Sequence, residues 1–176
     1  MVKYIFYTVL IFFFSSCRDN SVEILPSKID FPDQESWGVK ILLTKKGRLR
    51  AKIASGHLEK YNKKEFIFLN QSVKVHFFDN VENPSSVITS ESAEVDQVSN
   101  DMKAVGSVVA VSDSGITLYS ETLTYNFKEE RLFTKDSIKI TTLENDTLYG
   151  IGFESDSDLE NWHILKPTGV TNRGVK

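Results

Sequence analysis

From Trp37 onward, apolar and polar residues alternate in short runs that polar turns separate. A period of two places every second side chain on the same face of a strand. Turns such as Lys45-Lys46-Gly47 and Asp113-Ser114-Gly115 interrupt the pattern, and no long period of 3.6 residues competes with it. The pattern therefore predicts an all-β, antiparallel fold. The alternating sets include Val39/Ile41/Leu43, Leu49/Ala51/Ile53, Val73/Val75/Phe77, Val108/Ala110, Leu123/Tyr125/Phe127 and Ile138/Ile140.

Short similar segments recur along this region at intervals of about 30 residues. Successive members of each of two sets are separated by 35 or 30 residues. One such unit is a pair of strands that cannot bury its own apolar face, whereas stacked units bury a continuous one. The first set begins at Ser55, Ser90, Ser120 and Gly150, and the second begins at Ser72, Ser107 and Ser137.

The apolar parity changes just after the start of each unit. It shifts between Ser55 and Leu58, and again after Ser90 and after Ser120. A bulge or bend at a repeated position produces such a shift. We therefore expect a bent β-jellyroll, a trough of stacked hairpins that is open at its ends and carries unpaired edge strands.

The N-terminus has the pattern of an export signal. Lys3 is followed by an apolar run over residues 4–14 and then by Ser15-Ser16-Cys17. A helix of 11 residues is about 16 Å long, too short for a hydrocarbon core of about 30 Å. Small residues before the single cysteine resemble a bacterial lipoprotein signal, which predicts a signal peptide over residues 1–16 and lipidation of Cys17. The alternative is an uncleaved membrane anchor.

The remaining chain divides into three parts. Residues 17–36 are polar and contain Pro26 and Pro32, which is typical of a tether between a membrane and a domain. We expect the β-domain to cover residues 37–170 and a short tail to cover 171–176. A length of 176 residues suits one such domain.

Composition argues against most kinds of chemistry. The net charge of −3 provides no basic surplus for nucleic acid. A single cysteine excludes a disulfide framework and a multi-cysteine zinc site. Neither GxxxxGK[ST] nor GxSxG occurs, and His57, His76 and His163 lack paired ligand spacing. We therefore expect no enzyme, no cofactor and no metal.

An acidic run near the C-terminus leaves one weak alternative open. Glu154, Asp156, Asp158 and Glu160 alternate over seven residues. They could hold Ca²⁺ weakly, but they lack the glycine and the terminal bidentate glutamate of a calcium loop. A solvated acidic turn is the competing interpretation.

Several segments resemble the lipopolysaccharide-export family LptC. They are Pro32-Asp33-Gln34-Glu35-Ser36-Trp37 with residues 56–65, residues 99–104, and the run Gly150-Ile151-Gly152-Phe153-Glu154-Ser155-Asp156 followed by Leu159, Asn161, Trp162 and Ile164. The resemblance implies a curved β-jellyroll at the periplasmic face of the inner membrane. It also implies that the protein takes lipopolysaccharide from an ABC transporter and passes it to an LptA-like β-jellyroll bridge protein. Many family members carry a transmembrane N-terminal helix, whereas this chain has a lipoprotein signal.

A lipid carrier needs apolar cover rather than catalytic groups. We expect the inward side chains of the trough to bind the lipid, although the same alternation would also fill a closed core. The predicted lining residues are Leu49, Ala51, Ile53, Leu58, Val73, Val75, Phe77, Val95, Val108, Leu123, Tyr125, Ile138, Ile140 and Phe153.

A second predicted site is an edge at which a partner adds its strand. Glycines in a strand indicate a bend or a close backbone approach. The predicted docking residues are Gly150, Gly152, Phe153, Trp162 and Ile164. A purely structural bend, with docking elsewhere, is the alternative.

Charge is uneven along the chain. Residues 18–80 carry 12 Lys and Arg against 8 Asp and Glu, and residues 81–176 carry 8 against 16. The cluster Lys45, Lys46, Arg48, Arg50 and Lys52 could meet lipid phosphates or acidic headgroups. It could equally form a solvated strand face that discourages edge pairing.

Together these observations favour a non-enzymatic lipid conduit anchored in the periplasm by a lipidated N-terminus. The inner membrane follows from the resemblance, and the outer membrane stays open. The alternative is an assembly lipoprotein that scaffolds an envelope complex without carrying lipid. A hydrolytic or glycan-acting enzyme is a third, weaker possibility.

Overall fold

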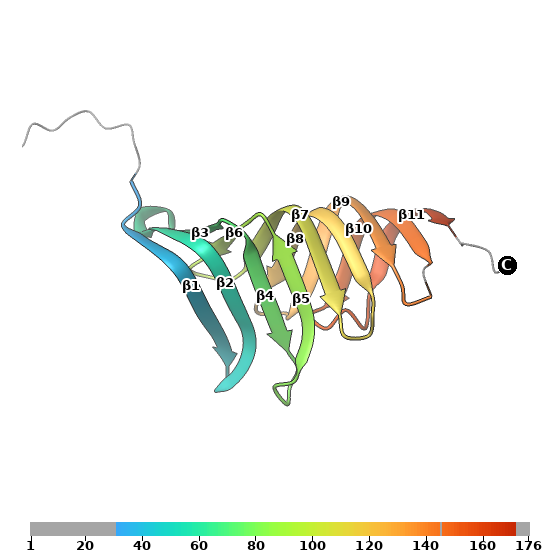
Figure 1. The fold of residues 1–176 in the computed structure, drawn as a ribbon, viewed down its shortest axis with the longest axis horizontal. Coiled ribbons are helices and arrows are strands. Elements are labelled where there is room, and N and C mark those ends of the chain that lie inside the picture. The colour runs from blue at the N-terminus through green and yellow to red at the C-terminus, as the bar shows by residue number, and fades with distance from the viewer. Residues whose placement is uncertain (1–30, 145, 172–176) are drawn as a thin grey trace, which may run out of the picture. The chain divides into compact units, whose positions relative to one another are not determined.

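The computed structural model describes residues 31–144 and 146–171, and these residues form eleven strands (Figure 1). One 3-10 turn, η1 (Asn62–Lys64), joins β2 to β3. Within the described ranges, no helix has the length and apolarity needed to span a bilayer. The strands are β1 (Gln34–Lys45), β2 (Arg48–Tyr61), β3 (Phe66–Asn70), β4 (Val73–Phe78), β5 (Pro84–Ser90), β6 (Ser92–Asp96), β7 (Met102–Ser112), β8 (Thr117–Asn126), β9 (Arg131–Thr141), β10 (Thr147–Asp156) and β11 (His163–Thr171).

All eleven strands belong to one antiparallel sheet, which confirms the predicted all-β fold. β3 and β4 follow one another along β2, and β5 and β6 follow one another along β7. When β3 with β4, and β5 with β6, are each counted as one bent strand, neighbours in the sheet are neighbours in the chain, from β1 at one edge to β11 at the other. Such a meander needs only short turns, which explains the regular spacing of the polar turns in the sequence.

The strands bend at equivalent positions along the sheet. The Gly56 N–H donates to the Gln71 carbonyl (3.3 Å), the Ser72 N–H to the Glu91 carbonyl (3.2 Å), and the Glu91 N–H to the Gly106 carbonyl (3.1 Å). The pairing of β7, β8, β9 and β10 shifts register at the corresponding places. These bends fall on the repeated segments that begin at Ser55, Ser72, Ser90, Ser107, Ser120, Ser137 and Gly150.

The row of bends divides the sheet into two leaves. The first leaf contains residues 39–45, 48–54, 73–78, 84–90, 108–112, 117–119, 137–141, 147–151 and 166–171. The second leaf contains residues 34–37, 57–61, 66–70, 92–96, 102–105, 124–126, 131–134, 153–156 and 163–164.

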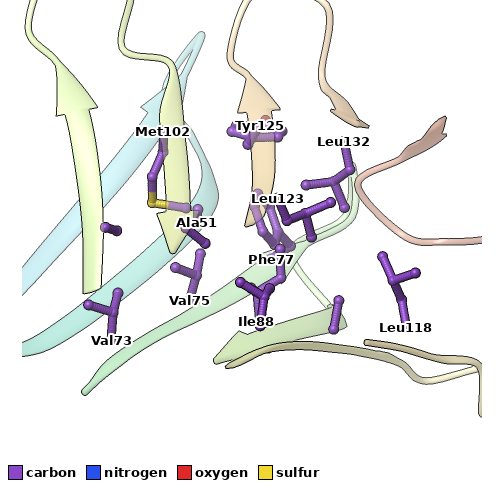
Figure 2. Packing of buried hydrophobic residues seen from close by; sticks show 14 of the residues in the cluster. Ala51, Val73, Val75, Phe77, Ile88, Met102, Leu118, Leu123, Tyr125 and Leu132 are labelled. Carbon is purple, nitrogen blue, oxygen red and sulfur yellow. The ribbon is translucent and has the colours of Figure 1, made fainter. Parts of the chain in front are cut away.

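The core lies between the two leaves. Phe77 of the first leaf meets Tyr125 of the second, with ring centroids 4.8 Å apart in an edge-on arrangement. Figure 2 shows these two rings beside Leu123 and Ile88, which are both buried. Because the pleat directs alternate side chains inward, each leaf contributes an apolar layer to one shared interior.

Some predicted boundaries differ from the observed ones by a few residues. The sheet begins at Gln34 rather than at 37, and it ends at Thr171. β5 begins already at Pro84. The predicted signal peptide over 1–16, the lipidated Cys17, most of the tether and the tail beyond 171 lie outside the described residues.

Candidate functional site

The structure gathers thirteen of the fourteen predicted lining residues in the space between the leaves, and Leu49 is the exception. Leu49 and Val95 are half-buried, and the other twelve are buried. Phe153, Ile140 and Leu123, which lie on different strands, are all 1% exposed or less. The interior is therefore continuous and apolar, and its side chains fill it in this conformation.

The leaves meet a second time at the ends that lie away from the bends, along a line that we call the seam. The seam is defined by Lys45, Arg50, Phe77 and Ser86 on the first leaf and by Tyr125, Glu130, Ser157 and Leu159 on the other side. Ser86 Oγ donates a hydrogen bond to the Ser157 carbonyl (2.5 Å). Leu159, in the loop between β10 and β11, is fully buried in the core. Side chains thus close the interior where the backbone sheet does not continue.

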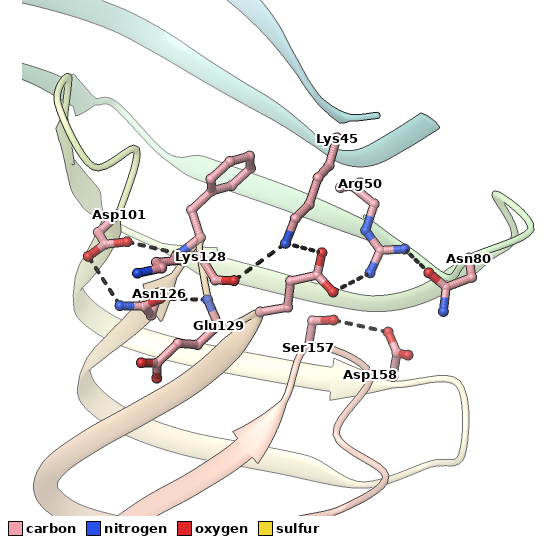
Figure 3. Close-up of polar contacts among 11 residues, drawn as sticks. Lys45, Arg50, Asn80, Asp101, Asn126, Lys128, Glu129, Ser157 and Asp158 are labelled. Carbon is pink, nitrogen blue, oxygen red and sulfur yellow. Dashed lines mark hydrogen bonds and ion pairs between the residues drawn. The ribbon is translucent and has the colours of Figure 1, made fainter. Parts of the chain in front are cut away.

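Glu130 is the main ionic link across the seam. Its two cationic partners, Lys45 and Arg50, are labelled in Figure 3. Its carboxylate lies 2.9 Å from Lys45 Nζ and 3.2 Å from Arg50 Nη2, and Lys45 Nζ also approaches the Lys128 carbonyl at 3.4 Å. The hydrogen bond from Lys45 and the nearby charge of Arg50 lower the pKa of Glu130, although partial burial opposes them. One carboxylate thus joins two cations of the first leaf to the β8–β9 turn.

A pocket of about 500 Å³ opens at this link. Its position follows from the tight β1–β2 hairpin, because Lys46 and Gly47 have φ of 53° and 79°. Positive φ at both central residues is the conformation of a type I′ turn. The hairpin and the facing β4–β5 turn bring together the lining residues Lys45, Lys46, Arg48, Arg50, Asn80 and Glu130.

Arg50 is the most buried charged group of this pocket, with 9% of its side chain exposed. Its guanidinium donates to Asn80 Oδ1 (3.0 Å) and to Glu130, and the neighbouring Arg48 donates to the Asn80 carbonyl (3.0 Å). Hydrogen bonds to both sides of the fork hold the group in place. Arg50 is therefore not part of a solvated strand face, which was one of the two interpretations of this basic cluster.

The predicted docking residues lie on two strands. Gly150, Gly152 and Phe153 are on β10, which pairs with β9 and β11, whereas Ile164 is on the edge strand β11 and Trp162 directly precedes it. A Cβ at Gly150 would collide with Ile164 Cγ2 and lie 2.9 Å from the Lys166 carbonyl. Phe153 is fully buried and stacks on Trp162 with centroids 6.5 Å apart. The glycines thus let β11 pack closely against β10.

A family model decides the relationship of this chain to known proteins. The model described as "LptC: Lipopolysaccharide-assembly, LptC-related" matches residues 19–171. The chain belongs to this LptC family. Its role is therefore in lipopolysaccharide transport, as the sequence resemblance implied.

One solved structure similar to this LptC-family chain is that of LptH from Pseudomonas aeruginosa, described as the LptA-homologous periplasmic component of the lipopolysaccharide transport device. The identity is 16%, the TM-score is 0.52, and the match covers 72% of this chain and 89% of LptH. At this identity the similarity shows the shared fold alone. No curated protein matches this chain.

The LptC-family sheet also brings together a cluster that the sequence analysis missed. Glu35 and Glu59 are opposite one another on β1 and β2, and both lie near His57. His57 Nε2 is 3.8 Å from Glu35, and Nδ1 is 3.6 Å from Glu59, while Trp37 stacks on the ring at 5.0 Å. The spacing His57-x-Glu59, which places both side chains on one face of a strand, was the available signal.

This cluster has the arrangement of an ionic bridge rather than of a metal centre. One ligand atom from each of the three residues lies within 4.8 Å of the others. A metal ion, however, binds one imidazole nitrogen, and here the two nitrogens face different carboxylates. His57 and Glu59 both lie on β2, so only the contact with Glu35 crosses from β2 to the edge strand β1.

The acidic run at the end of β10 is a structural turn in this fold. Asp156 accepts hydrogen bonds from the Glu160 N–H (2.9 Å) and from Asn161 Nδ2 (2.7 Å). Burial would raise the pKa of Asp156, but the hydrogen bonds from Asn161 and Glu160 lower it overall. These contacts hold the loop that carries Leu159 into the core.

The Glu130 link makes stability depend on pH in the acid range. Because its pKa is below the ordinary value of 4.5 in the folded chain, its contribution to the free energy of unfolding is complete above that value. The contribution is lost as the pH falls through the lowered pKa. We expect urea unfolding between pH 6 and pH 3 to show a shallower loss of stability for E130Q than for the wild type. E129Q changes the exposed neighbour and should follow the wild type; equal slopes for both variants would contradict the assignment.

Proposed function

We propose that this protein binds lipopolysaccharide between its two leaves and transfers it across the periplasm without chemical change. It would take the lipid from an inner-membrane ABC transporter and deliver it to an LptA-like β-jellyroll bridge protein. The observation that supports this proposal is the continuous apolar interior between the leaves. The strands join the two leaves only along the row of bends, so the opposite side of the interior is closed by side chains. The predicted lipid anchor at Cys17 would hold the protein at the inner membrane.

Lipid entry requires the leaves to separate along the seam. The contacts that we find there involve side chains, such as the Phe77–Tyr125 pair and the ion pairs of Glu130. An aromatic pair contributes about 0.5–1.5 kcal/mol beyond its buried area, and the more exposed of the two ion pairs, Lys45–Glu130, about 0.2–1 kcal/mol. Each buried CH₂ group of an acyl chain contributes about 0.8 kcal/mol. A few acyl chains would therefore offset the loss of these contacts.

The closed interior also favours a second candidate function. Residues such as Phe77 and Val75 are only 1% exposed, as in a permanently packed core. A sheet of this kind could scaffold an envelope complex through its edges and carry no lipid. The two functions differ in whether lipid reaches the side chains between the leaves.

Photo-crosslinking distinguishes them directly. We expect a benzophenone amino acid at Phe77 or Tyr125 to capture lipopolysaccharide in cells, because both rings lie in the interior beside the seam. Tyr149, which is 42% exposed, provides a matched aromatic control on the outer surface of β10. Capture should be at least tenfold greater at the interior positions. Equal capture at Tyr149, or capture only there, would favour the scaffold.

A further inference from the structure

The pocket at the seam holds more positive charge than its own carboxylate neutralises. Its lining contains four cations, Lys45, Lys46, Arg48 and Arg50, against the single anion Glu130. Lys45 and Arg50 share that anion, whereas Lys46 lies exposed at the tip of the hairpin. Converging cations with a nearly buried guanidinium form an environment that attracts a second, multivalent anion.

We propose that this pocket binds a phosphate group of the lipid headgroup, which displaces Glu130 from Lys45 and Arg50. This inference rests on the proposed function and assigns a place for the polar end of the same ligand. A phosphate presents three acceptor oxygens and up to two negative charges, whereas Glu130 presents two oxygens and one charge. The phosphate is therefore the stronger partner for a cluster of amines and guanidinium groups.

The place of the pocket relative to the core matches the shape of an amphiphile. Arg50 directly precedes Ala51, which is buried and pairs with Phe77 across the β2–β4 register. Tyr125, which packs against Phe77, lies close enough to Glu130 and Arg50 for both charges to act on its hydroxyl. A phosphate held by Arg50 would thus leave the attached acyl chains at the entrance to the apolar interior.

Displacement of Glu130 also connects headgroup binding with opening. Glu130 supplies both ion pairs that join the β8–β9 turn to the first leaf. A phosphate that binds Lys45 and Arg50 leaves the carboxylate free to move away with its turn. The ligand thereby removes a contact that holds the seam closed. Only a lipid whose acyl chains are attached to a charged headgroup would do so.

The test compares two charge reversals in the full chain. K46E places a negative charge in the pocket, and K74E makes the same change at an exposed position of β4 outside the pocket. The probes are lipopolysaccharide with its lipid phosphates, the same lipid after enzymatic dephosphorylation, and inorganic pyrophosphate. Dissociation constants come from titration calorimetry, and benzophenone capture at Tyr125 shows whether the lipid enters the interior.

We expect K46E to weaken binding of the phosphorylated lipid about tenfold and K74E to change it less than twofold. The dephosphorylated lipid should bind the wild type and K46E equally, and E130Q should bind the phosphorylated lipid more tightly than the wild type. Equal binding of both lipids by the wild type, or equal effects of K46E and K74E, would overturn the proposal.

The pyrophosphate titration separates this inference from the proposed function. If no lipid reaches Tyr125 but pyrophosphate binds and K46E weakens it, the source of the anion is free phosphate, and the headgroup assignment is overturned. If lipid reaches Tyr125 with no dependence on its phosphates, the proposed function stands and the phosphate site is refuted.

Discussion

Replacing Phe153 with alanine should lower the free energy of unfolding by about 3–5 kcal/mol, because the ring is fully buried between the leaves. Phe153 lies just after the bend of β10, where the register between β9 and β10 shifts. Its ring stacks on Trp162, so the cavity would open beside the residue that leads into β11. We therefore expect the C-terminal strand to lose order together with the core.

The matched control is Ile151→Ala on the same strand. Ile151 is 45% exposed, so its truncation should cost less than about 1 kcal/mol. Urea unfolding followed by far-UV circular dichroism measures both changes. A loss below 1 kcal/mol for F153A would mean that the interior is loosely packed. In that case the leaves would separate along the seam at a lower free-energy cost than the contacts there indicate.

The strands and their bends could be predicted from the sequence because both leave a periodic signal. Alternation at Val73, Val75 and Phe77 fixes one face of a strand, and the parity shift after Ser90 marks where that face changes. In the structure, the strand pairing breaks between β5 and β6 at Glu91, directly after Ser90. Local pattern and global fold agree here, which is typical of a repeated architecture.

The seam could not be predicted, because it depends on how far the two leaves close on one another. Arg50 and Glu130 are 80 residues apart and share no motif. Leu159 lies between the acidic residues Asp158 and Glu160, yet it is fully buried. Alternation identifies an inward face, but it contains no information on whether the facing leaf covers it. An open trough and a closed core are therefore equally compatible with the alternation.

The docking prediction illustrates a similar limit. Gly150 and Gly152 indicated a close backbone approach, and the structure shows that the approaching backbone is that of β11. β11 itself contains Pro167 and Gly169, which weaken any strand signal in the sequence. The pairing places Gly150, Gly152 and Phe153 on the inner strand β10 and Ile164 on the edge strand β11.

Ile164→Asp should weaken binding of the LptA-like bridge protein about 100-fold while lipid capture at Tyr125 continues. β11 ends the strand order of the sheet, and Ile164 is half-buried on the face that packs against the core. A partner strand added at this edge would extend that apolar face, with backbone hydrogen bonds for affinity and side-chain contacts for specificity. A carboxylate at the junction would be desolvated without a partner, and losses of 2–4 kcal/mol are typical of such central positions.

Ile41→Asp provides the matched control at the opposite edge. Ile41 is also a half-buried isoleucine that packs against the core, but it lies on β1. Both variants should lose similar stability in thermal unfolding, so a difference in bridge-protein binding measured by surface plasmon resonance reports docking rather than folding. Equal weakening by both variants would refute β11 as the docking edge. Weakening by I41D alone would assign the bridge protein to β1. The transporter would then be expected at β11, and lipid would enter the sheet from its C-terminal edge.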